Sequence, residues 1–137
     1  GDVFDSVIGL EKADAVLLDA PCSGSGVLRS RADLRWRKNK EDIAIMSGLQ
    51  GKMLDQVAET VRPGGRLVYS TCSLEPEENQ EVVEGFIKGH TDFEILDFNE
   101  SGRVDPWISK GGTEPYLTVF PPRHQLDGMF ISLMRRR

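Results

Sequence analysis

The sequence predicts an α/β fold with a mostly parallel sheet, because short apolar strands alternate with helical segments along the chain. The strands are predicted at 15–18, 66–70 and 93–96, with a helix between each pair. This order is typical of right-handed crossover units, in which consecutive strands run parallel. With 137 residues, of which 39% are hydrophobic and 28% charged, the chain has the size and composition of one globular domain.

The first strand is the apolar run Ala15-Val16-Leu17-Leu18, which ends at Asp19-Ala20-Pro21. So short an apolar run predicts a strand that is buried on both faces. The next residues, Cys22-Ser23-Gly24-Ser25-Gly26, are expected to form a loop, because glycine and serine at this density interrupt regular structure.

A helix is predicted from about Asp42 to Val61, because apolar residues recur three and four positions apart. These residues are Met46, Leu49, Met53, Val57 and Val61. The turn-forming segment Arg62-Pro63-Gly64-Gly65 is expected to end the helix, and the second strand follows it.

A second helix is expected to begin at Pro76, where Glu77 and Glu78 give the acidic first turn that the helix dipole favours. Gly89 is expected to end it. The segment 99–126 reads as irregular apart from a short alternating run at 117–120, and a last strand is predicted at 128–134. For the Arg triplet at 135–137, disorder and a contact with a binding partner both stay open.

The chain contains no G-x-G-x-x-G turn, which a doubly wound nucleotide-binding domain places after its first strand. We therefore expect residues 1–137 to form a single, incomplete domain, corresponding to the second half of such a fold. The amino-terminal, glycine-rich half that holds the cofactor is expected to lie outside these residues.

Charge and cysteine content narrow the function classes. Seventeen basic and 22 acidic residues give a net charge of −5, which argues against a protein that binds nucleic acid over its whole surface. No segment approaches the about 20 apolar residues of a membrane-spanning helix. Two cysteines and two histidines without a close ligand pair predict no metal site, and so few cysteines favour the reducing cytoplasm.

Both cysteines are expected at one edge of the sheet. Asp19 and Cys22 follow the first strand, whereas Thr71 and Cys72 follow the second, and parallel neighbours end at the same edge. A helix beginning near Pro76 would favour a thiolate at Cys72. Two alternatives remain at this point: that both thiols are inert fillers, and that they pair as a redox disulfide.

Five motifs resemble those of the RNA cytosine-5 methyltransferases, most similarly the bacterial Sun/Fmu (RsmB-like) enzymes that act on small-subunit ribosomal RNA. They are Asp19-Ala20-Pro21-Cys22-Ser23-Gly24, Pro63-Gly64-Gly65, Tyr69-Ser70-Thr71-Cys72-Ser73, Pro76-Glu77-Glu78-Asn79 and Asp127-Gly128-Met129-Phe130. The resemblance implies a class I, Rossmann-like methyltransferase domain with an antiparallel last strand. It also implies S-adenosylmethionine as the methyl donor and RNA as the substrate.

By this resemblance, Cys72 is the nucleophile that adds to C6 of the cytosine, and Cys22 assists loss of the C5 proton and release of the enzyme. Asp19 would hydrogen-bond the N3/N4 edge of the base, with a pKa raised by burial if it donates a proton. The cofactor would be bound by Asp2, Asp19, Ala20 and Pro21.

A basic segment directly after the Cys22 loop is the predicted RNA-binding element, in which cationic side chains would hold phosphates and Trp36 would stack on a base. Its residues are Arg29, Arg31, Arg35, Trp36, Arg37, Lys38 and Lys40. The alternative without RNA binding is that these basic side chains form a solvent-exposed face and that Trp36 packs in the core. Gly24 and Gly26 are expected to let the backbone approach a flipped base closely.

Two other functions compete with this interpretation: cytosine-5 methylation of DNA, and RNA binding or assembly without catalysis. The cytosine-5 DNA methyltransferases use the Pro-Cys cysteine as the nucleophile, but they resemble this chain less, because it carries Thr71-Cys72 at the second position. A non-catalytic RNA-binding or assembly module with the same fold would have no use for two thiols at one edge.

Overall fold

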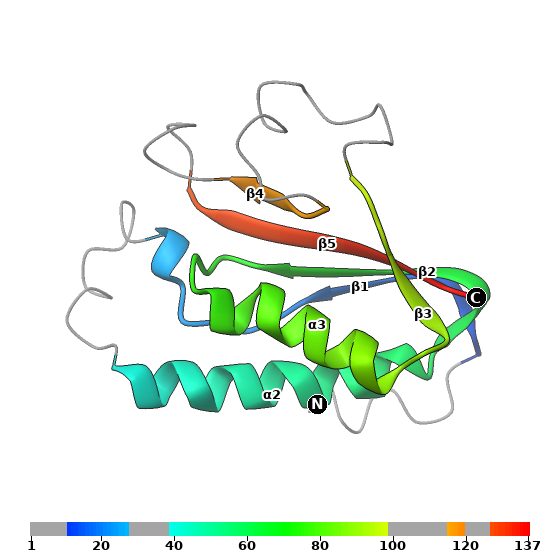
Figure 1. The fold of residues 1–137 in the computed structure, drawn as a ribbon, viewed down its shortest axis with the longest axis horizontal. Helices are drawn as coiled ribbons and strands as arrows, with labels where there is room; N and C mark the ends of the chain where they lie inside the picture. The colour runs from blue at the N-terminus through cyan, green and yellow to red at the C-terminus, as the bar shows by residue number, and fades with distance from the viewer. Residues whose placement is uncertain (1–10, 28–38, 99–114, 120–126) are drawn as a thin grey trace.

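The structure is a computed structural model that describes residues 11–27, 39–98, 115–119 and 127–137. Within these residues, five strands form one sheet in the order β1-β2-β5-β3, and β4 also pairs with β5 (Figure 1). The helices and strands in chain order are β1 (Ala13–Asp19), the 3-10 turn η1 (Ser25–Val27), α2 (Lys40–Ala58), β2 (Val61–Thr71), the 3-10 turn η3 (Pro76–Glu78), α3 (Gln80–Gly89), β3 (Phe93–Leu96), β4 (Leu117–Val119) and β5 (Met129–Arg136).

Four of these strands point the same way. β1 and β2 are parallel, with Leu18 opposite Tyr69. β5 runs antiparallel to β2 along one of its edges and antiparallel to β3 and β4 along the other. The predicted arrangement, a mostly parallel sheet with an antiparallel last strand, is confirmed.

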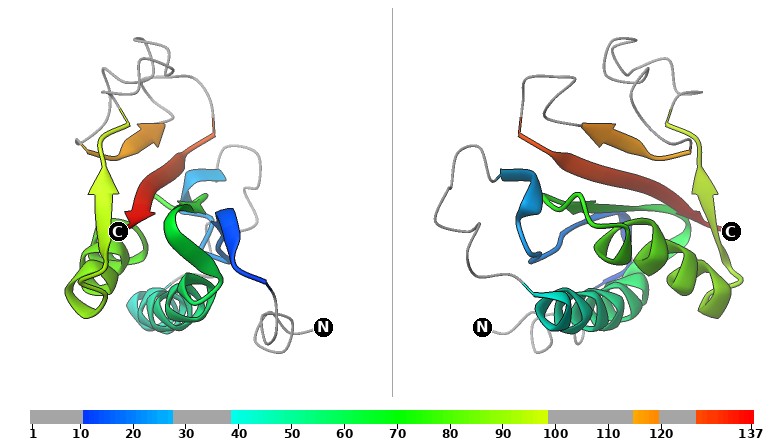
Figure 2. Two further views of the ribbon diagram at one scale, coloured as in Figure 1. Left: turned by 90° about the vertical axis from the view of Figure 1, so that its right-hand side faces the viewer. Right: turned by 60° about the vertical axis from the view of Figure 1, so that its left-hand side comes forward.

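Both long helices pack on one face of this sheet, as the two views of Figure 2 show. The core between them includes Leu54 of α2, Leu67 of β2 and Val83 of α3, all fully buried. On β1, Leu18 is buried whereas Leu17, which points to the opposite face, is 68% exposed. The prediction that this strand is buried on both faces is therefore wrong for the described residues, which place helices on one face only.

The helix α2 begins at Lys40, two residues before the predicted start, and ends at Ala58, three residues before the predicted end. Asn39 caps it, since its side chain accepts a hydrogen bond from the Asp42 N–H at 2.9 Å. The prediction that the helix continues to Val61 is wrong: the Thr60 hydroxyl and N–H both bond the Val57 carbonyl, at 2.7 and 3.0 Å. Val61 is instead the first residue of β2, fully buried and opposite Ala13.

The Pro-Gly-Gly segment lies inside β2 rather than between a helix and a strand. The pairing with β1 jumps from Ala13 opposite Val61 to Ala15 opposite Arg66, so the extra residues bulge out of the sheet. Gly64 makes the bulge possible with a φ of +78°, a conformation that favours glycine.

The second predicted helix forms in two pieces. Pro76–Glu78 is a 3-10 turn, and the α-helix begins only at Gln80. The break lies at Asn79, whose φ and ψ of −114° and −98° are not helical. Gly89 ends the helix as predicted. None of the helices in the described part of the chain is long and apolar enough to cross a membrane.

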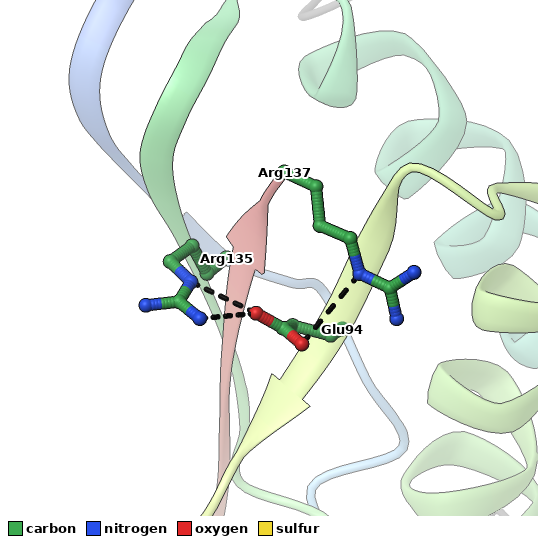
Figure 3. Close-up of polar contacts among 3 residues, drawn as sticks. All are labelled: Glu94, Arg135 and Arg137. Carbon is green, nitrogen blue, oxygen red and sulfur yellow. Dashed lines mark hydrogen bonds and ion pairs between the residues drawn. The ribbon is translucent and has the colours of Figure 1, made fainter.

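The Arg triplet, for which the sequence left two possibilities, forms ion pairs at the end of the sheet (Figure 3). Glu94 of β3 accepts hydrogen bonds from Arg135 and pairs with Arg137 at 3.6 Å. Hydrogen bonding from Arg135, followed by the charges of Arg135 and Arg137, holds the pKa of Glu94 below its usual value. Arg136 pairs with Asp92 at 2.9 Å.

Candidate active site

The carboxyl ends of β1 and β2 bring two thiols into contact. Cys22 lies three residues after β1, and Cys72 directly follows β2. Their Sγ atoms are 2.9 Å apart, and both cysteines are free and half-buried. The prediction that both thiols reach the same edge of the sheet is confirmed, because Asp19 and Ser70 end the parallel pairing side by side.

The surroundings of Cys22 keep its thiol protonated. Its pKa is raised to about 12, first by burial and then by the hydrogen bond and charge of Cys72, against the lowering effect of backbone N–H groups from Gly24 and Cys72. The Cys72 N–H reaches Cys22 Sγ at 3.3 Å. Either sulfur can be the donor in the contact between Cys22 Sγ and Cys72 Sγ.

A buried carboxylate lies between the two cysteine loops. Glu78 is fully buried. Its Oε1 accepts from the Ser23 N–H at 2.7 Å and from Gln50 Nε2 at 3.1 Å. Its Oε2 accepts from the Ser23 hydroxyl at 2.5 Å and from the Ser73 hydroxyl. Four donors thus occupy the acceptor sites of this side chain.

The neighbouring side chains fix the loop after β2. The Thr71 hydroxyl donates to Asn79 Oδ1 at 2.5 Å, and Asn79 Nδ2 donates to the Ser73 carbonyl at 2.8 Å. The Tyr69 hydroxyl donates to the Glu78 carbonyl at 2.6 Å. Burial, and next the charge of Glu78, raise the pKa of Tyr69 well above its usual value, so this donor keeps its proton.

The glycine loop after Cys22 packs against protein backbone. The Gly26 N–H donates to the Cys72 carbonyl at 2.9 Å, and the Gly26 carbonyl accepts from the Gly128 N–H at 2.7 Å. A Cβ at Gly26 would lie 2.6 Å from the Gly128 oxygen and 2.7 Å from the Cys72 oxygen. Position 26 therefore requires glycine for the close packing of the loops before β5 and after β2, and the expectation that Gly24 and Gly26 let the backbone approach a flipped base stays a prediction.

The residues expected at the cofactor lie on the same edge. Asp19 is exposed, with Oδ1 accepting from the Ser70 hydroxyl at 2.8 Å. Ala20 is buried, and its N–H donates to the Ser70 carbonyl at 2.9 Å. The Pro21 carbonyl accepts from Gln50 Nε2 at 2.9 Å. The burial expected at Asp19 is not supplied by the described residues, which leave this side chain exposed.

Other predicted site residues lie outside the described part of the chain. Asp2 is one of them, and so are all residues of the basic segment except Lys40, which is exposed at the start of α2. The residues outside are Arg29, Arg31, Arg35, Trp36, Arg37 and Lys38. Within the described ranges, no three His, Cys, Asp or Glu side chains gather to hold a metal ion.

Sequence reasoning missed Gln50 and the role of Glu78. Gln50 is fully buried on α2, and its Nε2 connects the Pro21 carbonyl to Glu78. Its position between Leu49 and Met53 on the apolar side of the helix was the available signal. For Glu78, the available signal was the serine that directly follows each cysteine. Ser23 and Ser73 lie at the same edge of the sheet, and buried hydroxyl groups need hydrogen-bond acceptors.

Comparison with known proteins decides the family. A family model described as 16S rRNA methyltransferase RsmB/F matches residues 1–135. The chain belongs to this family. Probable ribosomal RNA small subunit methyltransferase B of Synechocystis sp. is 39% identical over 132 residues, which make up 93% of this chain and 28% of that protein. Ribosomal RNA small subunit methyltransferase F of Klebsiella pneumoniae is 38% identical, over 99% of this chain and 28% of the relative.

A solved structure extends the likeness to the fold. The crystal structure of NSun6 from Pyrococcus horikoshii with SFG matches this RsmB/F chain with a TM-score of 0.79 at 28% identity, over 99% of this chain and 33% of that one. The resemblance to Sun/Fmu-like enzymes and the Rossmann-like methyltransferase fold are thus confirmed. The RsmB/F chain spans under a third of the length of the two curated relatives.

Proposed function

We propose that the protein containing this chain transfers a methyl group to C5 of a cytosine in RNA, and that the RNA is ribosomal. The observation that carries this proposal is the 2.9 Å contact between Cys22 Sγ and Cys72 Sγ at the carboxyl edge of β1 and β2. Membership in a family of 16S rRNA methyltransferases supports the reaction class.

The two thiols suit the two halves of the reaction. Cytosine C5 is a weak nucleophile, and addition of the Cys72 thiolate to C6 makes C5 electron-rich, which is covalent catalysis. The Cys72 Sγ–C6 bond forms first, C5 then takes the methyl group, and C5 next loses its proton. The returning electron pair expels Cys72 as the thiolate and restores the aromatic ring.

The environment of Cys22 fits the role of the group that takes the C5 proton. Two of the causes that raise its pKa, the hydrogen bond and the charge of Cys72, disappear once Cys72 Sγ is a neutral thioether bonded to C6. Loss of these two causes lowers the pKa of Cys22 at the stage at which a base is required, whereas burial, the largest cause, still raises it.

S-adenosylmethionine fits as the methyl donor, and when bound it supplies an electrophilic methyl group at a sulfonium centre. Asp19 offers an exposed carboxylate to a cationic ligand, and the Ala20 and Pro21 backbone is held by Ser70 and Gln50. SFG, an analogue of this cofactor, accompanies the NSun6 structure. Asp2 would contribute to the same site, and Asp19 would also bind the N3/N4 edge of the base.

The remaining assignments complete the proposal. RNA phosphates would be held by the basic residues between Arg29 and Lys38, with Trp36 stacking on a base. Residues 1–137 would form the carboxyl half of one catalytic domain in a cytoplasmic protein. A redox disulfide between the two thiols is the alternative, and a reducing cytoplasm would disfavour it.

The test is a methylation assay with the full-length protein, S-adenosylmethionine and small-subunit ribosomal RNA that lacks 5-methylcytosine. Digestion of the RNA to nucleosides and mass spectrometry should show 5-methylcytidine. A methyl group found at another position, or RNA binding with no methylation, would contradict the proposal; the second result would favour the non-catalytic RNA-binding module.

A further inference from the structure

We propose that Glu78 is a positioning residue that holds the Cys22 and Cys72 sulfurs at the separation required for methyl transfer. This inference rests on the proposed function and extends it to a side chain that touches neither sulfur. Glu78 acts through Ser23 and Ser73, each of which directly follows one of the two cysteines.

One carboxyl group joins three segments. Oε2 accepts from the Ser23 hydroxyl at 2.5 Å and from the Ser73 hydroxyl, so it bridges the loops after β1 and β2. Oε1 accepts from the Ser23 N–H at 2.7 Å and from Gln50 Nε2 at 3.1 Å, which adds α2. Gln50 in turn holds the Pro21 carbonyl, directly before Cys22, at 2.9 Å.

The carboxylate, rather than any polar group of the same shape, is what the donors require. All four contacts donate to Glu78, so a glutamine amide would direct its N–H groups at two hydroxyl donors or at two N–H donors. The Ser73 oxygen is also an acceptor for the Glu75 N–H at 3.0 Å. Reversal of the serine bonds would turn both hydroxyl protons away from residue 78, and the Ser73 oxygen would have to accept a second hydrogen bond beside that of the Glu75 N–H.

Full burial of Glu78 makes this arrangement costly if it has no function. Within the described residues, no Lys, Arg or His forms an ion pair with Glu78; its four partners there are neutral. A buried carboxylate with neutral partners carries a desolvation penalty that a well-packed apolar residue would avoid. A requirement for exact loop placement accounts for its presence here.

The reaction explains why placement matters. The sulfur of Cys72 must reach C6, while the sulfur of Cys22 must reach the proton on C5, the adjacent atom of the same ring. A displacement of about 1 Å in such a site can cost on the order of 100-fold in rate. Both serine hydroxyls bond the same Glu78 carboxyl group, so a shift of either cysteine loop would break a hydrogen bond that connects it to the other loop.

The experiment compares Glu78→Gln with Glu77→Gln in the full-length protein. Glu77 is the exposed neighbour on the same turn, so its variant loses the same charge without losing these contacts. Affinity for phenylarsine oxide, which bridges two adjacent thiols, reports the geometry of the sulfurs without requiring RNA. A Cys22→Ser variant lacks the thiol pair, so its affinity for phenylarsine oxide measures the contribution of all other thiols in the full-length protein. Single-turnover and steady-state assays of 5-methylcytidine give kcat and KM for RNA.

Glu78→Gln should weaken arsenical bridging by about tenfold or more, because two thiols that are no longer held together lose the advantage of bivalent binding. It should lower kcat by about 100-fold with KM for RNA unchanged, since binding does not depend on the sulfur separation. Glu77→Gln should match the unmodified protein in both assays. If Glu78→Gln keeps either its arsenical affinity or its kcat, the inference is overturned.

Two further outcomes are separable. If the unmodified protein makes no 5-methylcytidine, the proposed function fails, whereas the arsenical affinities still decide whether Glu78 holds the sulfurs. If Glu78→Gln does not fold, Ser23→Ala decides: it removes one donor to Oε2 and should weaken bridging by about fivefold. An unchanged affinity in Ser23→Ala would then overturn the inference.

Discussion

Gly26→Ala should separate the two cysteine loops and destabilise the fold strongly. The added Cβ would meet three backbone atoms, the Gly128 oxygen at 2.6 Å, the Cys72 oxygen at 2.7 Å and the Gly128 carbonyl carbon at 2.8 Å. Backbone cannot turn aside as a side chain can, so overpacking alone should cost about 1–3 kcal/mol. The shift would also weaken the hydrogen bonds from Gly26 to Cys72 and from Gly128 to Gly26, at about 1 kcal/mol each.

The expected loss in the free energy of unfolding is therefore about 3–5 kcal/mol. Urea unfolding followed by circular dichroism measures it. Gly48→Ala is the matched control, because a Cβ at this exposed position of α2 would meet nothing within 4 Å. It should stabilise the helix by about 1 kcal/mol. A loss of less than about 1 kcal/mol in Gly26→Ala would refute the close packing of the loops.

Three further predictions concern the thiol, the end of the sheet and the cofactor. With a pKa of about 12 in place of 9.0, Cys22 should react with iodoacetamide at pH 8 about 1000-fold more slowly than an ordinary thiol; an ordinary rate, followed by peptide mass spectrometry, would contradict this. The stability that this raised pKa contributes is present below pH 9 and is lost as the pH rises toward 12. Arg136→Met should lower the free energy of unfolding by about 1.5–3 kcal/mol, because it breaks the bonds to the Val61 carbonyl and Asp92. Arg137 is exposed, so Arg137→Met should lower it by under about 0.5 kcal/mol. Equal losses for the two variants in urea unfolding would count against this ranking. Calorimetry of the 137-residue chain should show weak or no binding of S-adenosylmethionine, and micromolar affinity would reject that expectation.

The positions of the two thiols could be predicted from the sequence because few local rules decide them. Strands rich in apolar residues predict the parallel pair β1 and β2, and parallel strands end at the same edge. Cys22 and Cys72 follow those ends within three residues, so their arrival at one edge needed no knowledge of side-chain packing, whereas the 2.9 Å contact between their sulfurs is a finding of the structure.

The helix boundaries and the buried polar cluster could not be predicted in this way, since tertiary contacts decide them. Val61 continues the apolar spacing of α2, yet it is the first residue of β2, where it pairs with Ala13 of the neighbouring strand β1. Glu78 looks like an exposed acid in the first turn of a helix. Its burial follows from donors 28 and 55 positions away along the chain, on Gln50 and Ser23.

The central claim is that Cys72 forms the covalent bond and Cys22 releases it, and one gel tests this most directly. The full-length protein carrying Cys22→Ala or Cys72→Ala would be incubated with S-adenosylmethionine and ribosomal RNA, then separated under denaturing conditions. The account predicts a protein–RNA adduct that accumulates in Cys22→Ala and is absent in Cys72→Ala. An adduct only in Cys72→Ala would reverse the two roles, and no adduct in either variant, with no 5-methylcytidine from the unmodified protein, would contradict the covalent mechanism.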